Sequence, residues 1–288
     1  MEPLKTLDVD GRTIAYRVID LVPPWQRDNV ETIFFHHGLA ALSEMWLDWL
    51  PTLVGRYRIV LFDMFGCGRS SLEGSPRDWS IDSRVADVFA LVDRLELGKI
   101  HFVGESYGGT IGLVAGLRAP ERFASLGICN ASHHGARIDN TDEFVARVER
   151  DGVRSWSDRL MRDRFFDDGL PPAKRDWYSW QQGNHTPASI ANILRELINV
   201  DIADQVNDIE LPVLLLHADS SPFISVSVMV ELHQQIRNSE FQVFAHSKHG
   251  LPFSHSAACA AALSDFLGRL HSKQQQGLAA PLAYTQKR

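Results

Sequence analysis

Short runs of apolar residues alternate with longer segments of helical periodicity along most of the chain. The apolar runs cover residues 32–38, 58–63, 99–105, 125–130, 212–218 and 240–246. Each run is continuous, which is typical of a strand buried on both faces in a parallel sheet. Residues 80–97 are an example of a segment with helical periodicity, in which Val85, Val88, Phe89 and Val92 recur at helical spacing. This alternation predicts an open α/β sheet covered by helices.

The two ends of the chain depart from this alternation. Asp10 and Gly11 form a turn signal inside the first twenty residues, which predicts an antiparallel strand pair. Residues 272–288 lack an apolar packing face, and we expect them to form a mobile tail.

Residues 131–205 also interrupt the pattern. They have helical periodicity, no clear strand and several large aromatic side chains: Trp156, Phe165, Phe166, Trp177 and Trp180. We therefore predict a helical cap at 131–205, inserted into a core domain made of residues 1–130 and 206–271.

Composition narrows the range of partners. The chain has 288 residues, a net charge of −7, 44% hydrophobic and 23% charged residues, as in an ordinary globular protein. A nucleic acid or an anionic membrane requires a basic surface, so neither is expected as a partner, and a homodimer remains open.

Three cysteines without zinc-type spacing indicate free thiols in a reducing compartment. No signal segment and no run of about 18 apolar residues is present, which favours a cytoplasmic protein.

The chemistry concentrates at residues 104–108, Gly-Glu-Ser-Tyr-Gly, which fit G-x-S-x-G between a predicted strand and a predicted helix. A sharp strand-to-helix turn exposes the serine hydroxyl, and glycines at 104 and 108 remove clashes with its neighbours. Ser106 is therefore the candidate nucleophile. Further glycines at 109, 112 and 116 would let the helix lie close to the sheet.

An oxyanion hole can be formed from backbone amides near the end of an earlier strand. In the segment His36-His37-Gly38-Leu39, the Leu39 amide is one candidate donor and the Tyr107 amide is the other. His36 and His37 could suggest a metal site. Because neighbours on a strand point to opposite faces, packing and loop positioning are the expected roles.

A serine hydroxyl needs a general base. His246, His249 and His255 all lie in the late segment "AHSKHGLPFSHS". His246 barely leaves the last strand and His255 begins the final helix, whereas His249 lies in the middle of the loop. His249 is therefore the predicted base.

These motifs resemble those of α/β-hydrolase-fold proteins with a helical cap, over residues 4–270. The matching segments are "HHG" at 36–38, "FDMFGCGRS" at 62–70, "VGESYGG" at 103–109 and "KHGLPFSHSAACAAALSDFL" at 248–267. The resemblance implies a mostly parallel eight-stranded sheet. The spacing from His249 to the pair Phe266-Leu267 also matches the family's spacing after its catalytic histidine.

A weaker resemblance connects the start of the cap to 3-oxoadipate enol-lactonases and related ester hydrolases. It implies a small ester or lactone substrate, with a carboxylate that Arg137 could bind if this arginine is not simply solvated. Trp156, Trp177 and Trp180 are candidates for lining the pocket, and packing between cap helices is the alternative.

The acid of the triad is the open point. The family usually places it three residues after the small residue that closes the strand, and counting from Ala218 that position is Ser221. A serine can accept a hydrogen bond from imidazole but cannot stabilise an imidazolium by charge. The alternative position, at residues 130–135, has no carboxylate. Asp219 therefore remains as the expected acid, although an extended backbone would displace it by about 6–7 Å.

Together these features predict a serine-dependent hydrolase of a small carboxylic ester or lactone that works through an acyl-enzyme. No metal or organic cofactor is expected. Two alternatives stay open: a carbon–carbon bond hydrolase of ring-cleavage products, and a ligand sensor on a hydrolase scaffold.

Overall fold

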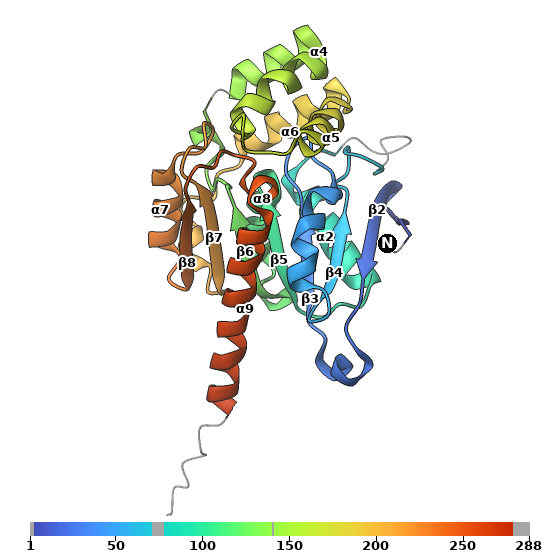
Figure 1. Ribbon diagram of the computed structural model, residues 1–288, viewed down its shortest axis with the longest axis vertical. Coiled ribbons are helices and arrows are strands. Elements are labelled where there is room, and N and C mark those ends of the chain that lie inside the picture. Colours follow the sequence, from blue (N-terminus) through green and yellow to red (C-terminus); the bar gives the residue numbers. More distant parts are fainter. Residues whose placement is uncertain (1–2, 71–77, 140, 279–288) are drawn as a thin grey trace, which may run out of the picture.

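The computed structural model describes residues 3–70, 78–139 and 141–278. Its centre is an eight-stranded sheet in the order β1-β2-β4-β3-β5-β6-β7-β8 (Figure 1). The strands are β1 Lys5–Val9, β2 Arg12–Ile19, β3 Thr32–His36, β4 Arg58–Phe62, β5 Ile100–Glu105, β6 Phe123–Cys129, β7 Val213–Ala218 and β8 Ser239–Phe244. The pairs β1–β2 and β2–β4 are antiparallel, and the remaining pairs are parallel. This arrangement confirms the predicted mostly parallel sheet.

Every predicted apolar run contains a strand, but one prediction about burial is wrong. Strands β3 and β5 are fully buried, whereas β8 exposes Gln242 and Val243. The side chain of Val243 is 41% exposed. The reason is position: β8 is an edge strand, with a neighbouring strand on one side only.

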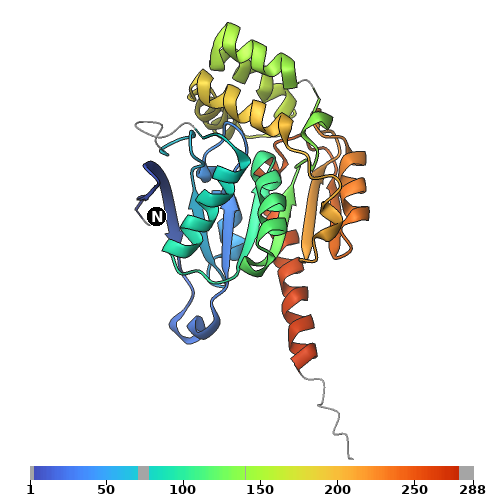
Figure 2. The same ribbon diagram turned by 180° about the vertical axis from the view of Figure 1, so that it is seen from behind.

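Helices cover both faces of the sheet. Figure 1 shows α9 (Ser256–Leu278) across one face, where it packs with α1 (Leu50–Leu53) and the 3₁₀ helix η2 (Ser43–Trp49). Figure 2 shows the other face, with α2 (Ile81–Arg94), α3 (Tyr107–Arg118) and α7 (Val226–Gln235). The short helices are η1 Pro24–Asn29, η3 Pro120–Arg122, η4 Gly135–Arg137, η5 Val206–Asp208 and α8 Leu251–Ser254.

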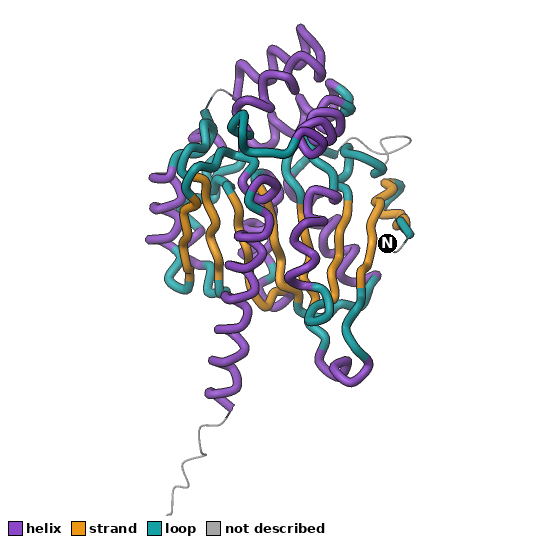
Figure 3. The backbone as a smooth tube through the Cα atoms, in the orientation of Figure 1, coloured by secondary structure: helices purple, strands orange, loops and turns teal. Residues whose placement is uncertain are grey.

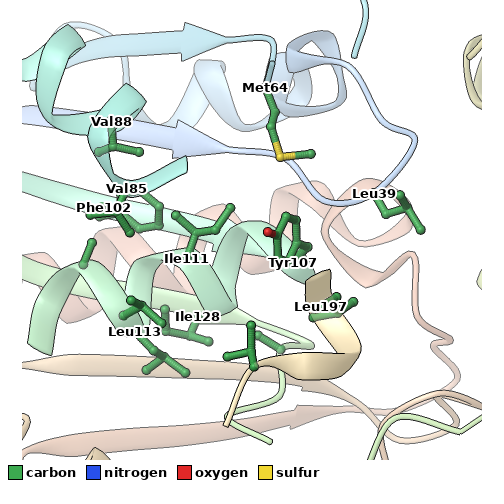
Figure 4. Packing of buried hydrophobic residues seen from close by; sticks show 14 of the residues in the cluster. Leu39, Met64, Val85, Val88, Phe102, Tyr107, Ile111, Leu113, Ile128 and Leu197 are labelled. Carbon is green, nitrogen blue, oxygen red and sulfur yellow. The ribbon is translucent and has the colours of Figure 1, made fainter. Parts of the chain in front are cut away.

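Because both faces are covered, the buried side chains form two cores. Alternate residues of a strand enter different cores: Phe102 of β5 joins one and Val103 joins the other. Figure 4 shows the first core, where Phe102 lies with Val85 and Val88 of α2 and with Ile111 of α3.

Three helices form a layer beyond the carboxyl ends of the parallel strands (Figure 3). They are α4 Thr141–Arg164, which is kinked at Gly152, α5 Pro172–Gly183 and α6 Pro187–Asn199. We call them the helical layer. An antiparallel bridge between His134 and Asp201 brings the entry and the exit of this segment together. The layer therefore lies above the strand ends that carry the predicted catalytic residues.

The chain ends agree in part with expectation. Asp10 and Gly11 adopt positive φ, as the predicted hairpin turn requires. Helix α9 continues to Leu278, so residues 272–278 of the predicted tail are helical; residues 279–288 lie outside the described residues. No helix in the described part of the chain is both long and apolar enough to cross a membrane.

Helix α3 approaches the sheet closely through its glycines, as predicted. A Cβ atom added at Gly112 would lie 2.4 Å from the ring of Phe102, and one at Gly109 would lie 2.6 Å from Cβ of Ala131. Both neighbours are fully buried and have no room to withdraw. The position of α3 therefore depends on these glycines.

We expect Gly112→Ala to lower the free energy of unfolding by roughly 1–3 kcal/mol, the usual cost of overpacking a core. The matched control is Gly268→Ala in α9, where an added Cβ meets nothing within 4 Å. The control should be neutral or stabilising by up to about 1 kcal/mol. Denaturant unfolding measures both, and equal effects would show that α3 can move away from the sheet.

Candidate active site

Ser106 stands at a strained turn between β5 and α3. Its backbone has φ 53° and ψ −122°, a conformation that non-glycine residues rarely adopt. A Cβ at Gly104 would lie 2.4 Å from the carbonyl oxygen of Gly108, and one at Gly108 would lie 2.5 Å from that of His36. These distances confirm the predicted steric role of the two flanking glycines.

His249 meets Ser106 inside the molecule. A hydrogen bond of 3.1 Å joins His249 Nε2 to Ser106 Oγ, and the two residues are only 3% and 9% exposed. The backbone around His249 is held on both sides: Asn130 Nδ2 donates to the His249 carbonyl, and the Gly250 amide donates to the Arg164 carbonyl. The structure thus brings the predicted nucleophile and the predicted base together.

The two competing histidines lie elsewhere. His246 stacks on the ring of Phe166 with a centroid distance of 4.4 Å and pairs with Asp168. The Nδ1 atom of His255 is hydrogen-bonded to Ser254.

The expectation for Asp219 needs correction. Its carboxylate accepts hydrogen bonds from the backbone amides of His246, at 2.9 Å, and Ser247, at 3.0 Å. The atom next to His249 Nδ1 is Ser221 Oγ, at 3.1 Å. Asp219 directly follows β7, and its carboxylate binds the two amides at the start of the loop after β8. Ser221, two positions later, is the residue that contacts the imidazole of His249. The alternative position after β6 holds Asn130, whose amide accepts from the Ala218 amide.

The environment keeps the imidazole of His249 neutral. Burial lowers the pKa of His249 well below its usual value, and the nearby Arg164 and His217 lower it further. A carboxylate at the Ser221 position would raise this pKa, but a hydroxyl carries no charge. The serine therefore orients the ring without stabilising its protonated form.

Two charged residues that the sequence did not single out lie beside this pair. Glu105 Oε1 is 3.8 Å from His249 Nε2, and Arg164 Nη1 is 3.4 Å from the same oxygen. All three residues are buried. Burial raises the pKa of Glu105, an effect that Arg164 opposes without cancelling. Glu105 occupies a position that the G-x-S-x-G motif leaves free, and Arg164 comes 59 residues later, so only the fold reveals this pair.

The two segments that carry the predicted oxyanion donors adjoin Ser106. Tyr107 is the first residue of α3, so its amide has no acceptor within the helix. The other segment is pressed against the nucleophile, since a Cβ at Gly38 would lie 2.9 Å from Cβ of Ser106. Arg164 Nη2 donates to the Leu39 carbonyl at 3.1 Å and so holds this loop.

A cavity of about 40 Å³ opens onto Ser106 beneath the helical layer. Its polar lining is Ser106, His249 and Arg164. The remaining lining residues are apolar: Leu39, Ile138, Phe144, Trp156, Leu160, Leu194, Leu197, Phe223 and Ile224. Figure 4 shows Leu197 of α6 near Tyr107 and Leu39. The site is therefore apolar apart from the reacting groups and one arginine.

Of the four predicted pocket residues, only Trp156 lines this cavity. Trp177 stacks on Phe253 with a centroid distance of 5.6 Å, and Trp180 is 55% exposed. Arg137 forms an ion pair with Glu231 at the surface. The structure therefore places Trp177 and Trp180 of α5 and Arg137 of η4 outside the lining of this cavity.

His36 and His37 serve loop positioning, as expected. The Nδ1 atom of His36 is hydrogen-bonded to the His37 carbonyl, and His37 Nε2 accepts from the Met64 amide. Both rings are buried, and burial lowers the pKa of His36 to about 3.

Comparison with known proteins finds relatives over most of the chain. The chain is 27% identical to 3-oxoadipate enol-lactonase 1 of Acinetobacter baylyi over 224 residues, which are 75% of this chain and 81% of that protein. It is 26% identical to the putative carbamate hydrolase RutD of Caulobacter segnis over 261 residues, 86% of this chain and 92% of the relative. The crystal structure of the enol-lactonase from Burkholderia xenovorans LB400 superposes with a TM-score of 0.83 at 20% identity, covering 92% of this chain and 100% of that one.

The family model for the alpha/beta hydrolase fold matches residues 31–256. This span includes Ser106, Ser221 and His249 together with strands β3 to β8. The chain belongs to the alpha/beta hydrolase fold family.

Proposed function

We propose that the protein is a serine-dependent hydrolase of a carboxylic ester or lactone and that it works through an acyl-enzyme. The observation that carries this proposal is the 3.1 Å hydrogen bond between Ser106 Oγ and His249 Nε2 in a buried pocket. The strained conformation of Ser106, which costs about 1–3 kcal/mol, supports a functional role. The enol-lactonase and putative carbamate hydrolase among the relatives also favour hydrolysis at a carbonyl carbon.

In this mechanism Ser106 Oγ attacks the substrate carbonyl while His249 Nε2 takes its proton. The amides of Leu39 and Tyr107 donate to the oxyanion. The tetrahedral intermediate then expels the alcohol, which receives the proton from His249. A water molecule, activated by His249 in turn, attacks the acyl group and releases Ser106.

The third member of the constellation is Ser221. In the tautomer that leaves Nε2 free as the base, His249 Nδ1 donates its hydrogen to Ser221 Oγ. This bond orients the ring but provides no charge. When His249 accepts the proton, the buried carboxylate of Glu105, 3.8 Å from Nε2, is the group that can stabilise the imidazolium electrostatically.

The pocket favours a neutral substrate with apolar substituents. Its lining is apolar, and the one cation in it, Arg164, already pairs with Glu105 and the Leu39 carbonyl. Its volume of about 40 Å³ is far below the roughly 300–1,000 Å³ of typical ligand pockets. The helical layer therefore acts as a cap that must move to admit a substrate.

A fluorophosphonate probe tests the nucleophile. We expect one covalent adduct per chain on Ser106, detected by intact mass and peptide mapping, and no adduct in Ser106→Ala. Ser221→Ala is the matched control and should still be labelled, since it keeps both nucleophile and base. Labelling at another residue would overturn the assignment. A folded wild-type protein that is never labelled would favour the ligand sensor.

Substitutions at residues 219 and 221 separate orientation from loop support. Ser221→Ala should lower kcat by roughly 3- to 10-fold, which corresponds to one lost neutral hydrogen bond. Asp219→Asn should change kcat by less than about 2-fold but lower the free energy of unfolding by about 1 kcal/mol, because the loop after β8 loses a charge-assisted bond. Steady-state kinetics and thermal melts measure both. A large loss of kcat in Asp219→Asn alone would restore Asp219 as the acid.

The pH profile tests the environment of His249. Because its pKa is depressed, we expect the acidic limb of kcat/KM to have its midpoint clearly below pH 6.5. Arg164→Gln removes a neighbouring cation and should shift this limb to higher pH. Arg159→Gln, an exposed cation on the same helix, is the control and should leave the profile unchanged. A wild-type midpoint at or above 6.5 contradicts the expectation.

A further inference from the structure

A second cluster of reactive side chains lies at the opposite end of β5 from Ser106. Among the described residues, Glu31, His101 and His271 bring one ligand atom each within 4.8 Å of one another. Glu31 directly precedes β3, His101 is the second residue of β5, and His271 belongs to α9. His101 comes five residues before Ser106 on an extended strand, a separation of about 17 Å. The cluster is therefore separate from the hydrolase site.

The imidazole of His101 has one ring nitrogen in a hydrogen bond and the other available to a ligand. His101 is buried, and its Nε2 atom has no hydrogen-bond partner, although Glu31 Oε2 lies 3.4 Å away. The contact with Glu31 is long for a hydrogen bond, and an ion between the two groups would satisfy this buried nitrogen. The other ring nitrogen, Nδ1, is hydrogen-bonded to Ser125 Oγ at 2.8 Å. Ligating histidines usually make such a bond, which fixes the ring orientation and leaves the opposite nitrogen for the metal.

The remaining two groups complete a recognised donor set. His271 Nε2 contacts the same Glu31 oxygen, so both imidazoles converge on one carboxylate. Two imidazole nitrogens and one carboxylate oxygen suit zinc. Ligand atoms of a tetrahedral zinc ion lie about 3.4 Å apart, since each bond is about 2.0–2.1 Å long.

We propose that Glu31, His101 and His271 bind one Zn²⁺ ion, with the fourth coordination position open to water. The three ligands come from the segment before β3, from β5 and from α9, so the ion fastens the C-terminal helix to the sheet. Figure 1 shows α9 extending past the end of the sheet at which these strands begin. Binding to the folded state alone would stabilise the protein. The opposing interpretation is a plain Glu31–His271 ion pair, which needs no metal.

Zinc titration of the untagged, chelator-treated full-length chain tests the proposal. Calorimetry should show one equivalent of Zn²⁺ per chain. The Tm should rise by roughly 5–10 °C when free Zn²⁺ exceeds Kd a hundredfold. Mg²⁺ should have no comparable effect, because it prefers oxygen ligands.

Single substitutions identify the ligands. Glu31→Gln and His271→Ala should each abolish the binding heat and the zinc-dependent shift in Tm. His246→Ala is the matched control: it removes a histidine that faces a carboxylate at 3.2 Å in an exposed pair, and among the described residues this pair belongs to no three-ligand group. The control should bind zinc as the wild type does. Absence of stoichiometric zinc binding in the wild type, or unchanged binding in both ligand variants, would overturn the proposal and leave the ion pair.

Discussion

The conformation of Ser106 is the constraint on which the rest of the site depends. A non-glycine residue with positive φ between β5 and α3 persists only where close packing holds the backbone on both sides. Gly104 and Gly108 allow that packing, since any side chain at either position would overlap backbone atoms. Packing of β5 and α3 in the buried cores offsets the conformational strain at Ser106. Because β5 lies in the middle of the sheet, its turn also lies beside the ends of β3 and β6.

Arg164 connects the helical layer to three segments that adjoin the candidate site. Its guanidinium contacts Glu105 and the Leu39 carbonyl, and its own carbonyl accepts from the Gly250 amide. One residue at the end of α4 thus touches the neighbour of the nucleophile, the oxyanion loop and the neighbour of the base. Under the proposed function, a movement of the layer that admits substrate would therefore also act on these groups.

The electrostatics of the centre differ from those of a triad with a charged third member. Ser221 supplies a neutral partner to His249, and the buried charges nearby belong to Glu105 and Arg164. Arg164 lowers the pKa of His249, and Glu105 Oε1 lies 3.8 Å from its Nε2 atom. Burial, Arg164 and His217 lower the basicity of the imidazole, and no charge at residue 221 opposes them.

The sequence by itself determined the sheet, the elbow and the candidate base. Apolar runs indicate buried strands. The glycines around Ser106 indicate a tight turn in which side chains would clash, and this pattern lies within one short segment of the chain. Burial of β8 was predicted wrongly, since strand order within a sheet is decided by long-range pairing. The choice between Asp219 and Ser221 also depended on tertiary structure. The two residues are two positions apart in one loop, and the path of that loop is set by hydrogen bonds to the segment after β8. Glu105 with Arg164, and Glu31 with His101 and His271, are likewise assembled by contacts between distant segments. Their local sequence gives no sign of these contacts, because side chains distant along the chain meet only when the sheet and its helices pack.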